Sequence, residues 1–364
     1  MRATEACLAA LVRKYKEAGY PARRFSVFVM PRFAVLDCED AAKWSAHEKL
    51  WIAALGQDDD EWLHFRCWAG ELPPASGEVL SAFDGFVVTG SHHDAYSDLP
   101  WVVSLAAFLK KAVEQGRPRI LGACFGCQLL ARALGGSVGR NPSGRFVVGC
   151  ERYVLCEQEL GKRADWRAAR AACRPVAGEH EARTTLRVLT SHGDAVLALP
   201  PHAVALASSP TTRFELWSLG DNVFAQQGHP EMSPSQLKEK ILPGLVDKKR
   251  VTADEAAAAA VAAEGELDAG LLLAMGRAFL RGGDGAHTPL CRPPPQTRKT
   301  TDFFDDSSRH RRLHRRRGGR GRGCRHGRLF GVGGRRRRDL TRAIRLHHVS
   351  HLFIYSFNDS VARQ

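Results

Sequence analysis

The feature that most constrains the fold is the recurrence of short apolar runs separated by segments with helical spacing. Runs rich in Val, Ile, Leu and Phe are typical of strands that are buried on both faces of a sheet. We predict strands at residues 26–30, 62–68, 85–90, 119–123, 151–156, 187–191, 204–208, 213–219 and 222–227. We predict helices at residues 103–115, 125–134, 234–246, 253–264 and 266–281. This alternation indicates an α/β fold in which a mostly parallel sheet carries helices on both faces.

The last two predicted strands lie very close together in the sequence. Little more than Gly220 and Asp221 separates them, so we expect a late antiparallel hairpin. In open α/β sheets, ligands bind at the carboxyl ends of the strands. The chemistry of this protein is therefore expected there.

The charge of the chain is distributed unevenly. The 364 residues have a formal net charge of +14, which by itself would suggest a nucleic-acid-binding protein. Residues 291–364 hold 20 of the 53 Lys and Arg and 5 of the 39 Asp and Glu, so 33 basic and 34 acidic residues remain before them. All seven Trp lie between Trp44 and Trp217, within one core-forming segment. We predict an N-terminal extension at 1–25, a main domain at 26–250, C-terminal helices at 251–283 and a tail at 284–364.

The tail has a composition unlike that of the rest of the chain. It contains Pro293–Pro295 and an Arg/Gly tract at 315–328, and such a composition buries too little apolar surface to fold. We therefore predict a disordered basic tail. It could bind RNA through phosphate charge and Arg stacking. From residue 300 onward it has 17 Arg and no Lys, a skew that a GC-rich stretch read in the wrong frame would also give, and we favour an appendage without a selected role.

Several sequence features bear on location. No apolar run approaches the roughly 18 residues of a membrane helix, and the N-terminal apolar stretch is too short for a secretory signal. The ten Cys are scattered without regular spacing, which indicates free thiols in a reducing compartment. We predict a cytosolic protein without membrane contact.

The most informative segment is RILGACFGCQLLARALGG, residues 119–136. Gly122 and Gly126 stand two residues on either side of Cys124, which matches a nucleophile elbow with Cys in place of Ser. Glycines at these positions permit a tight strand-to-helix turn. The N-terminus of the following helix would stabilise a thiolate, and the backbone N–H of Phe125 would point toward an oxyanion. On spacing alone, a buried structural cysteine in a tight turn fits equally well.

A base for this thiol stands later in the chain. The segment QQGHPEMS, residues 226–233, places His229 at the end of the last predicted strand and Glu231 two residues beyond it. Cys, then His, then a carboxylate that orients the imidazole is the logic of a catalytic triad. A single Gly-His-Pro is more often an ordinary loop, but both groups here would lie at strand carboxyl ends of one sheet.

These motifs together resemble a known family. The pattern around Cys124, with the downstream Gly228-His229-Pro230-Glu231, resembles the class I glutamine amidotransferases over roughly residues 26–250. Three further segments are similar to the stand-alone gamma-glutamyl peptidases of plants: GFVVTGSHHDAYSD (85–98), TSHGDAVLALP (190–200) and FAQQGHPE (224–231). Those are cytosolic enzymes that trim the γ-glutamyl residue from glutathione conjugates. The resemblance implies a three-layer, doubly wound, flavodoxin-like fold.

The resemblance also implies roles for particular residues. Cys124 would be the nucleophile, His229 the base and Glu231 its orienting partner. It implies oxyanion donors in the backbone of Phe125 and of Gly90 or Ser91. It implies weaker substrate contacts from Gln128, His192 and Asp194, although His192 could instead be a structural residue at a strand end.

The activity expected from the resemblance is hydrolysis of a γ-glutamyl amide bond through a glutamyl thioester. The substrate would be glutathione, a glutathione conjugate or a related γ-glutamyl peptide, with no metal or organic cofactor. One alternative is a glutaminase subunit that needs a synthetase partner, for which we see no room after residue 250. Another is a non-catalytic protein of this fold that binds RNA only through its tail. The sequence leaves the oligomeric state open.

Two features depart from the family pattern or compete with it. Cys127 stands where family members usually carry His, and it forms a C-x-x-C with Cys124 that could be a thioredoxin-like redox pair. Against a redox pair, the preceding strand lies in the middle of a large sheet. Zinc would require further ligands, and His92-His93-Asp94 and His347-His348 are the remaining candidates, so we expect no structural metal.

One connection between predicted strands is unusually long. The stretch 157–186 separates two predicted strands and is longer than a simple connection. Its Arg residues could face a substrate carboxylate, but we favour a solvated surface excursion.

Overall fold

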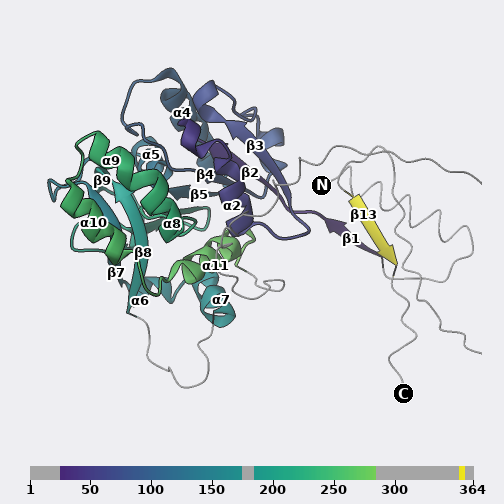
Figure 1. Ribbon diagram of the computed structural model, residues 1–364. Helices are drawn as coiled ribbons and strands as arrows, with labels where there is room; N and C mark the ends of the chain where they lie inside the picture. The colour runs from purple at the N-terminus through teal and green to yellow at the C-terminus, as the bar shows by residue number, and fades with distance from the viewer. Residues whose placement is uncertain (1–24, 174–183, 284–351, 357–364) are drawn as a thin grey trace, which may run out of the picture. The chain divides into compact units, whose positions relative to one another are not determined.

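The computed structural model describes residues 25–173, 184–283 and 352–356 (Figure 1). Its larger compact unit lies within residues 30–296 and is built on a nine-stranded sheet. In order across the sheet, the strands are β3 (Glu61–Arg66), β2 (Arg32–Asp37), β4 (Gly85–Val88), β5 (Arg119–Ala123), β12 (Val223–Gln226), β11 (Leu216–Leu219), β10 (Val204–Ser208), β7 (Val147–Leu155) and β8 (Thr185–His192). The first five run parallel, and the remaining four continue the sheet through antiparallel pairings. The predicted hairpin is confirmed as β11 and β12.

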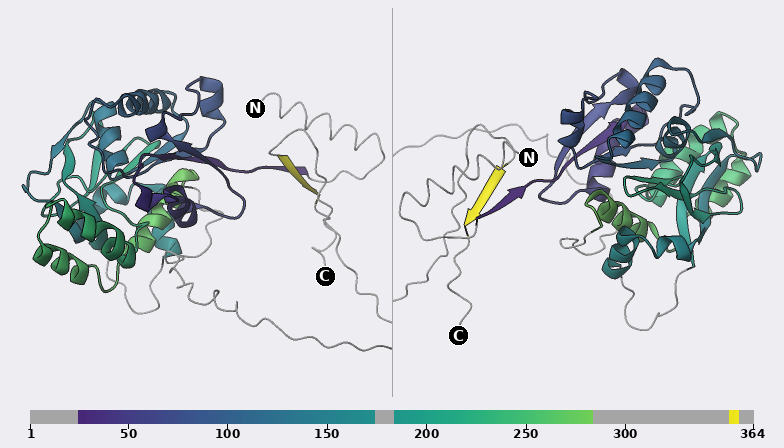
Figure 2. Two further views of the ribbon diagram at one scale, coloured as in Figure 1. Left: turned by 45° about the horizontal axis from the view of Figure 1, so that its top comes forward. Right: turned by 180° about the vertical axis from the view of Figure 1, so that it is seen from behind.

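Successive side chains of the parallel strands enter two different hydrophobic clusters. In β2, Phe33 and Val35 join one cluster, whereas Ala34 and Leu36 join the other. Because neighbouring residues of a strand point to opposite faces, this arrangement requires cover on both faces. The helices α2 (His47–Leu55), α7 (Ala164–Ala172) and α11 (Ala269–Leu280) pack with the first cluster. The helices α4 (Pro100–Glu114) and α5 (Phe125–Ala133) pack with the second, so the predicted three-layer α/β fold is confirmed (Figure 1, Figure 2).

A smaller hydrophobic cluster covers the antiparallel end of the sheet. It includes Leu189 of β8 and residues of the segments Leu237–Ile241, α9 (Leu242–Asp247) and α10 (Ala253–Ala262), which follow the short helix α8 (Pro234–Gln236). We predicted one helix over 234–246, but the structure has a π-helical turn at Leu237–Ile241. Pro243 has no N–H to donate to the preceding turn, which accounts for the irregularity.

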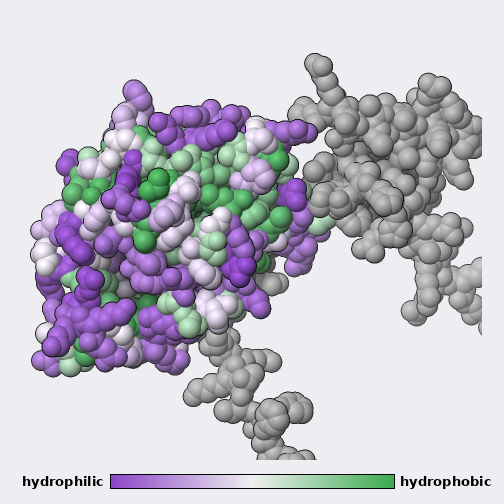
Figure 3. Space-filling view, turned by 90° about the horizontal axis from the view of Figure 1, so that it is seen from above, coloured by the Kyte–Doolittle hydropathy of each residue, from purple (hydrophilic) through white to green (hydrophobic). Residues whose placement is uncertain are grey.

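The remaining elements are short. They are η1 (Ala42–Trp44), η2 (Cys67–Ala69), α3 (Gly77–Ser81), α6 (Glu157–Leu160) and a two-stranded sheet of β6 (Ser137–Arg140) and β9 (Asp194–Ala198). Polar residues cover much of the face shown in Figure 3, with hydrophobic residues gathered in the middle of that face. No helix in the described part of the chain has the length and apolar character needed to cross a bilayer.

The predicted first strand, 26–30, does not join the main sheet. Strand β1 (Phe25–Val29) pairs antiparallel with β13 (Leu352–Ser356) in a separate two-stranded sheet. Along the chain, the first strand of the main sheet is instead β2, which the sequence pattern did not reveal. Two apolar runs flank Pro31, and their spacing does not reveal which of them enters the sheet. The predicted disordered tail lies outside the described residues except for the residues of β13.

The interpretation of residues 157–186 was wrong. Helix α7 packs against α11, and Trp166 is 2% exposed within the main core. Arg163 pairs with Asp165, so it is not available to a substrate. Cys173, which follows α7, is disulfide-bonded, and the expectation of free thiols fails at that position. The described part of this stretch is a piece of the helical layer, and residues 174–183 lie outside the described residues.

Glu215 is a buried carboxyl whose protonation is linked to stability. It is fully buried and accepts a hydrogen bond of 2.7 Å from the Ser209 hydroxyl. Burial raises the pKa of Glu215 to about 8, and nearby Glu151 adds to this, while hydrogen bonds from Ser209 and Tyr153 oppose it. In the unfolded chain, the Glu215 carboxyl ionises at lower pH than it does in the folded protein. The free energy of unfolding therefore falls as the pH rises toward 8.

We therefore expect Glu215→Gln to stabilise the protein in a pH-dependent way. The amide keeps an acceptor for Ser209 but cannot ionise, so the free energy of unfolding should exceed that of wild type by on the order of 1–3 kcal/mol at pH 8. The difference should be smaller at pH 5. Urea denaturation at both pH values measures it, and an equal difference at the two would contradict the assigned protonation.

Candidate active site

The candidate site lies at the carboxyl ends of three neighbouring parallel strands. Strand β5 pairs with β4 on one side and with β12 on the other, which places Val88, Gly122 and Ala225 in one row. Each strand is followed within a few residues by a predicted site residue: Gly90, Cys124 and His229. Because parallel strands end at the same edge, the sheet brings these distant segments together.

Cys124 sits in a strained turn between β5 and α5. Its φ of 49° and ψ of −105° lie where residues other than glycine rarely occur. A Cβ on Gly122 would lie 2.7 Å from the carbonyl oxygen of Gly126, and one on Gly126 would lie 2.3 Å from that of Val88. The glycine spacing is thus required by close backbone contact as well as by backbone freedom.

His229 and Glu231 form a buried pair beside this turn. The imidazole Nδ1 of His229 lies 2.8 Å from Oε1 of Glu231, and the two residues are 8% and 6% exposed. The backbone N–H of His229 donates to the carbonyl of Leu189 at 2.8 Å, which fixes the segment against β8. Burial lowers the pKa of His229, but the charge of Glu231 and the Cys124 thiol outweigh it and hold that pKa well above its usual range. The site therefore favours an imidazolium.

Gly90 closes the space between the imidazole and the thiol. A Cβ at this position would lie 3.0 Å from Cε1 of His229 and 3.6 Å from Cβ of Cys124. Across the described residues, the backbone N–H groups of Gly90, Ser91 and Phe125 donate no hydrogen bond to the protein. Three donors thus remain available near the thiol, in the loop after β4 and at the N-terminus of α5.

The three predicted substrate contacts are linked to one another. The amide of Gln128 donates to the carbonyl of Asp194 at 3.0 Å and to Oε1 of Gln227 at 3.2 Å. His192 donates from Nδ1 to the same carbonyl at 2.8 Å, which leaves Nε2 as an acceptor without a partner in the described residues. Burial lowers the pKa of His192 to about 4, so the ring is neutral at physiological pH. The Asp194 carboxylate lies 3.2 Å from Arg140.

All predicted site residues except Phe125 line one cavity of about 220 Å³. Several charged residues that the sequence pattern did not reveal also line it, among them Glu39, Lys43, Lys248 and Arg250. Glu39 and Lys43 follow β2, the strand that the pattern also did not reveal. Recognising that strand would have placed their loop at the carboxyl edge of the sheet.

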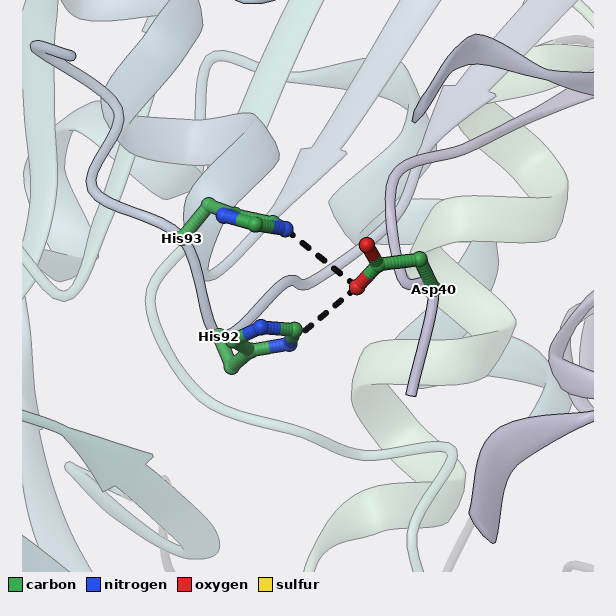
Figure 4. Close-up of side chains that lie close together, drawn as sticks. All are labelled: Asp40, His92 and His93. Atoms are coloured by element: carbon green, nitrogen blue, oxygen red, sulfur yellow. Dashed lines mark hydrogen bonds and ion pairs between the residues drawn. The ribbon is translucent and has the colours of Figure 1, made fainter. Parts of the chain in front are cut away.

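A cluster of His and Asp side chains lies at the cavity edge, and it contains a different Asp from the cluster considered in the sequence. His92 and His93 converge on Asp40 rather than on Asp94: Nδ1 of His92 and Nε2 of His93 lie 3.6 and 3.2 Å from Oδ1 of Asp40 (Figure 4). Glu39 also lies 2.7 Å from Nδ1 of His92, and its hydrogen bond raises the pKa of that imidazole. Asp40, His92 and His93 each place one ligand atom within 4.8 Å of the others, a spacing that a divalent cation could use. The absence of a structural metal stays a prediction.

Cys127 lies away from the cavity, on the core side of α5. It is fully buried and accepts a hydrogen bond from Nε1 of Trp217 at 3.1 Å. Burial raises the pKa of its thiol, which disfavours the thiolate that disulfide exchange requires. Cys124 and Cys127 are both free thiols in the structure. This environment favours a packing role for Cys127 over a redox pair.

Comparisons with known proteins identify the family of this chain. The family model described as glutamine amidotransferase class-I matches residues 72–248. Gamma-glutamyl peptidase 3 of Arabidopsis thaliana is 31% identical over 218 residues, which are 60% of this chain and 80% of that protein. Gamma-glutamyl peptidase 4 of the same plant is 34% identical over 204 residues, 54% of this chain and 73% of that protein. A crystal structure of a glutamine amidotransferase from Thermotoga maritima has a TM-score of 0.51 at 18% identity, covering 70% of this chain and 99% of that one, and shows likeness of fold.

The fold and the cavity define an α/β protein with a cysteine elbow. The chain belongs to the class I glutamine amidotransferase family, and it is a hydrolase of that family. Within the family, its sequence is similar to the two plant gamma-glutamyl peptidases.

The contact between α5 and β4 can be tested by Gly126→Ala. The added Cβ would meet the backbone of Val88, which cannot move without disturbing the sheet, so we expect a loss of roughly 2–4 kcal/mol in the free energy of unfolding. Gly77→Ala is the control, since its Cβ would meet only the flexible Gln115 side chain. Thermal and urea denaturation compare them, and equal stability of the two variants would show that the close contact is not a constraint.

Proposed function

We propose that this protein hydrolyses the γ-glutamyl amide bond of glutathione, its conjugates or related γ-glutamyl peptides. The observation that carries the proposal is the convergence of Cys124, His229 and Glu231 on one cavity that also receives free backbone donors. The names of the plant relatives support a γ-glutamyl substrate. The small-molecule substrate is the only partner that the proposal requires.

Cys124 is the nucleophile in the proposed reaction. The raised pKa of His229 favours transfer of the thiol proton to its imidazole, which leaves a thiolate at the N-terminus of α5. The thiolate attacks the γ-carbonyl carbon, and the N–H groups of Phe125 and of Gly90 or Ser91 hold the oxyanion. The C–N bond then breaks as His229 protonates the departing amine.

Water completes the cycle on the glutamyl thioester. Neutral His229 takes a proton from water, the oxygen attacks the thioester carbonyl, and the C–S bond breaks to release glutamate. The thiolate and the imidazolium are restored. Glu231 orients and stabilises the imidazolium, while Gln128, His192 and Asp194 provide substrate contacts at the side of β8 and β9.

Removing the thiol tests the nucleophile. For Cys124→Ala we expect at least a ~10³-fold loss of glutamate release from glutathione and from a glutathione S-conjugate. Cys156→Ala is the matched control because that free thiol is exposed and outside the cavity. Release from glutamine alone would favour a glutaminase subunit, and no release from any substrate would favour a binding protein of this fold.

Glu231→Gln tests the orienting carboxylate through pH dependence. Because Glu231 raises the pKa of His229, its loss should lower that pKa. Protonated His229 is needed for departure of the amine, so the alkaline limb of kcat/KM should move to lower pH by on the order of one unit, with a reduced maximum. Glu264→Gln, an exposed carboxylate paired with Lys238, is the control. An unshifted limb would remove Glu231 from this role.

Two sequence-based expectations stay predictions. Cytosolic location rests on the scattered spacing of the ten Cys. RNA binding could occur only through the tail, which lies mostly outside the described residues.

A further inference from the structure

One wall of the cavity is lined by basic side chains from two distant segments. Lys43 belongs to η1 after β2, while Lys248 and Arg250 follow the end of α9. All three line the same cavity as Cys124. None of the residues to which the resemblance gives a role lies in these segments.

The two segments are tied together by reciprocal hydrogen bonds. Nζ of Lys43 donates to the carbonyl of Lys240 at 2.8 Å, and Nζ of Lys240 donates to the carbonyl of Lys43 at 3.0 Å. The Lys240 ammonium also lies 4.7 Å from the centre of the Trp44 ring. Lys43 is thereby held in place with two of its N–H groups left over for another acceptor.

The acidic groups of the cavity already have partners. Glu231 pairs with His229, Asp194 with Arg140 and Glu39 with His92, and Asp94 shares a hydrogen bond with Asp194. The cations Lys43, Lys248 and Arg250 have no carboxylate at ion-pair distance in the described residues, although the charge of Glu39 acts on Lys43 and that of Arg250 acts on Asp194.

Lys43 and Lys248 act on each other electrostatically. Partial burial lowers the pKa of Lys43, Glu39 opposes this, and the charges of Lys248 and Lys240 lower the pKa further. Lys248 likewise acts against the positive charge of His92. Like charges gathered at one wall of a cavity favour the binding of an anion between them.

We propose that Lys43 and Lys248 form a subsite for the carboxylate at the C-terminal end of the leaving peptide. This inference rests on the proposed function, because it assumes that the γ-glutamyl group is bound at Cys124. The cysteinylglycine released from glutathione carries such a carboxylate, whereas the ammonia released from glutamine carries none. The subsite therefore selects γ-glutamyl peptides with an anionic leaving group over glutamine and over uncharged γ-glutamyl amides.

The test compares two substrates that differ only in this charge. They are S-methylglutathione and its C-terminal glycinamide, and glutamate release gives kcat/KM for each. Wild type should prefer the acid by roughly three- to tenfold, mainly through a lower KM. Lys43→Gln and Lys248→Gln should each bring the ratio toward one by weakening hydrolysis of the acid alone. Lys248→Glu should reverse the preference.

Lys249→Gln is the matched control, because it removes the same charge one residue away and does not line the cavity. It should leave the ratio at its wild-type value, and Lys43→Arg should largely preserve it. An equal ratio in wild type and Lys248→Gln, with both substrates hydrolysed, would overturn the subsite while leaving the peptidase intact. An equal fall in Lys249→Gln would also overturn it in favour of general surface charge. Hydrolysis of neither substrate by wild type would instead refute the proposed function.

Discussion

The close backbone approach of α5 to β4 is the constraint on which the site depends. Gly126 lies so near the carbonyl of Val88 that no side chain fits between them, and its N–H donates to the carbonyl of Thr89. This contact sets where α5 begins, and hence where Cys124 turns away from the sheet with a positive φ. The same approach brings the N–H of Phe125 and the loop of Gly90 to one side of the thiol. The positions of the proposed nucleophile and oxyanion donors therefore follow from this one packing contact.

The antiparallel half of the sheet supports the site from the other side. Strand β8 supplies the carbonyl of Leu189, which holds His229, and the carbonyl of Ser191, which lies 3.9 Å from the Cys124 sulfur. The same strand ends at His192, whose ring is neutral because it is buried. A buried imidazolium is costly unless its charge is balanced, and Glu231 provides that balance for His229. The pKa values of His192 and His229 thus shift in opposite directions, because His229 faces a carboxylate and His192 does not.

The irregular helical segment after His229 gives the cavity its basic wall. The π-turn at Leu237–Ile241 separates α8 from α9, and α9, which carries Pro243 in its first turn, ends just before Lys248. Lys240 of the π-turn bonds to Lys43 across a sequence separation of 197 residues. The loop after β2 and the segment around α9 therefore form one surface. The proposed subsite for the carboxylate of the leaving group lies on this surface.

The sequence determined the local features of this protein. The elbow at Cys124, the late hairpin and the short connection from β12 to His229 and Glu231 all depend on glycines and apolar runs within a few residues, so spacing predicts them. Tertiary structure decided which distant segments come into contact. Only packing places β2, rather than β1, in the main sheet, pairs Asp40 with His92 and His93, and joins Lys43 to Lys240. Contacts of this kind carry no local pattern, because their free energy arises only after the chain has folded and brought the groups together.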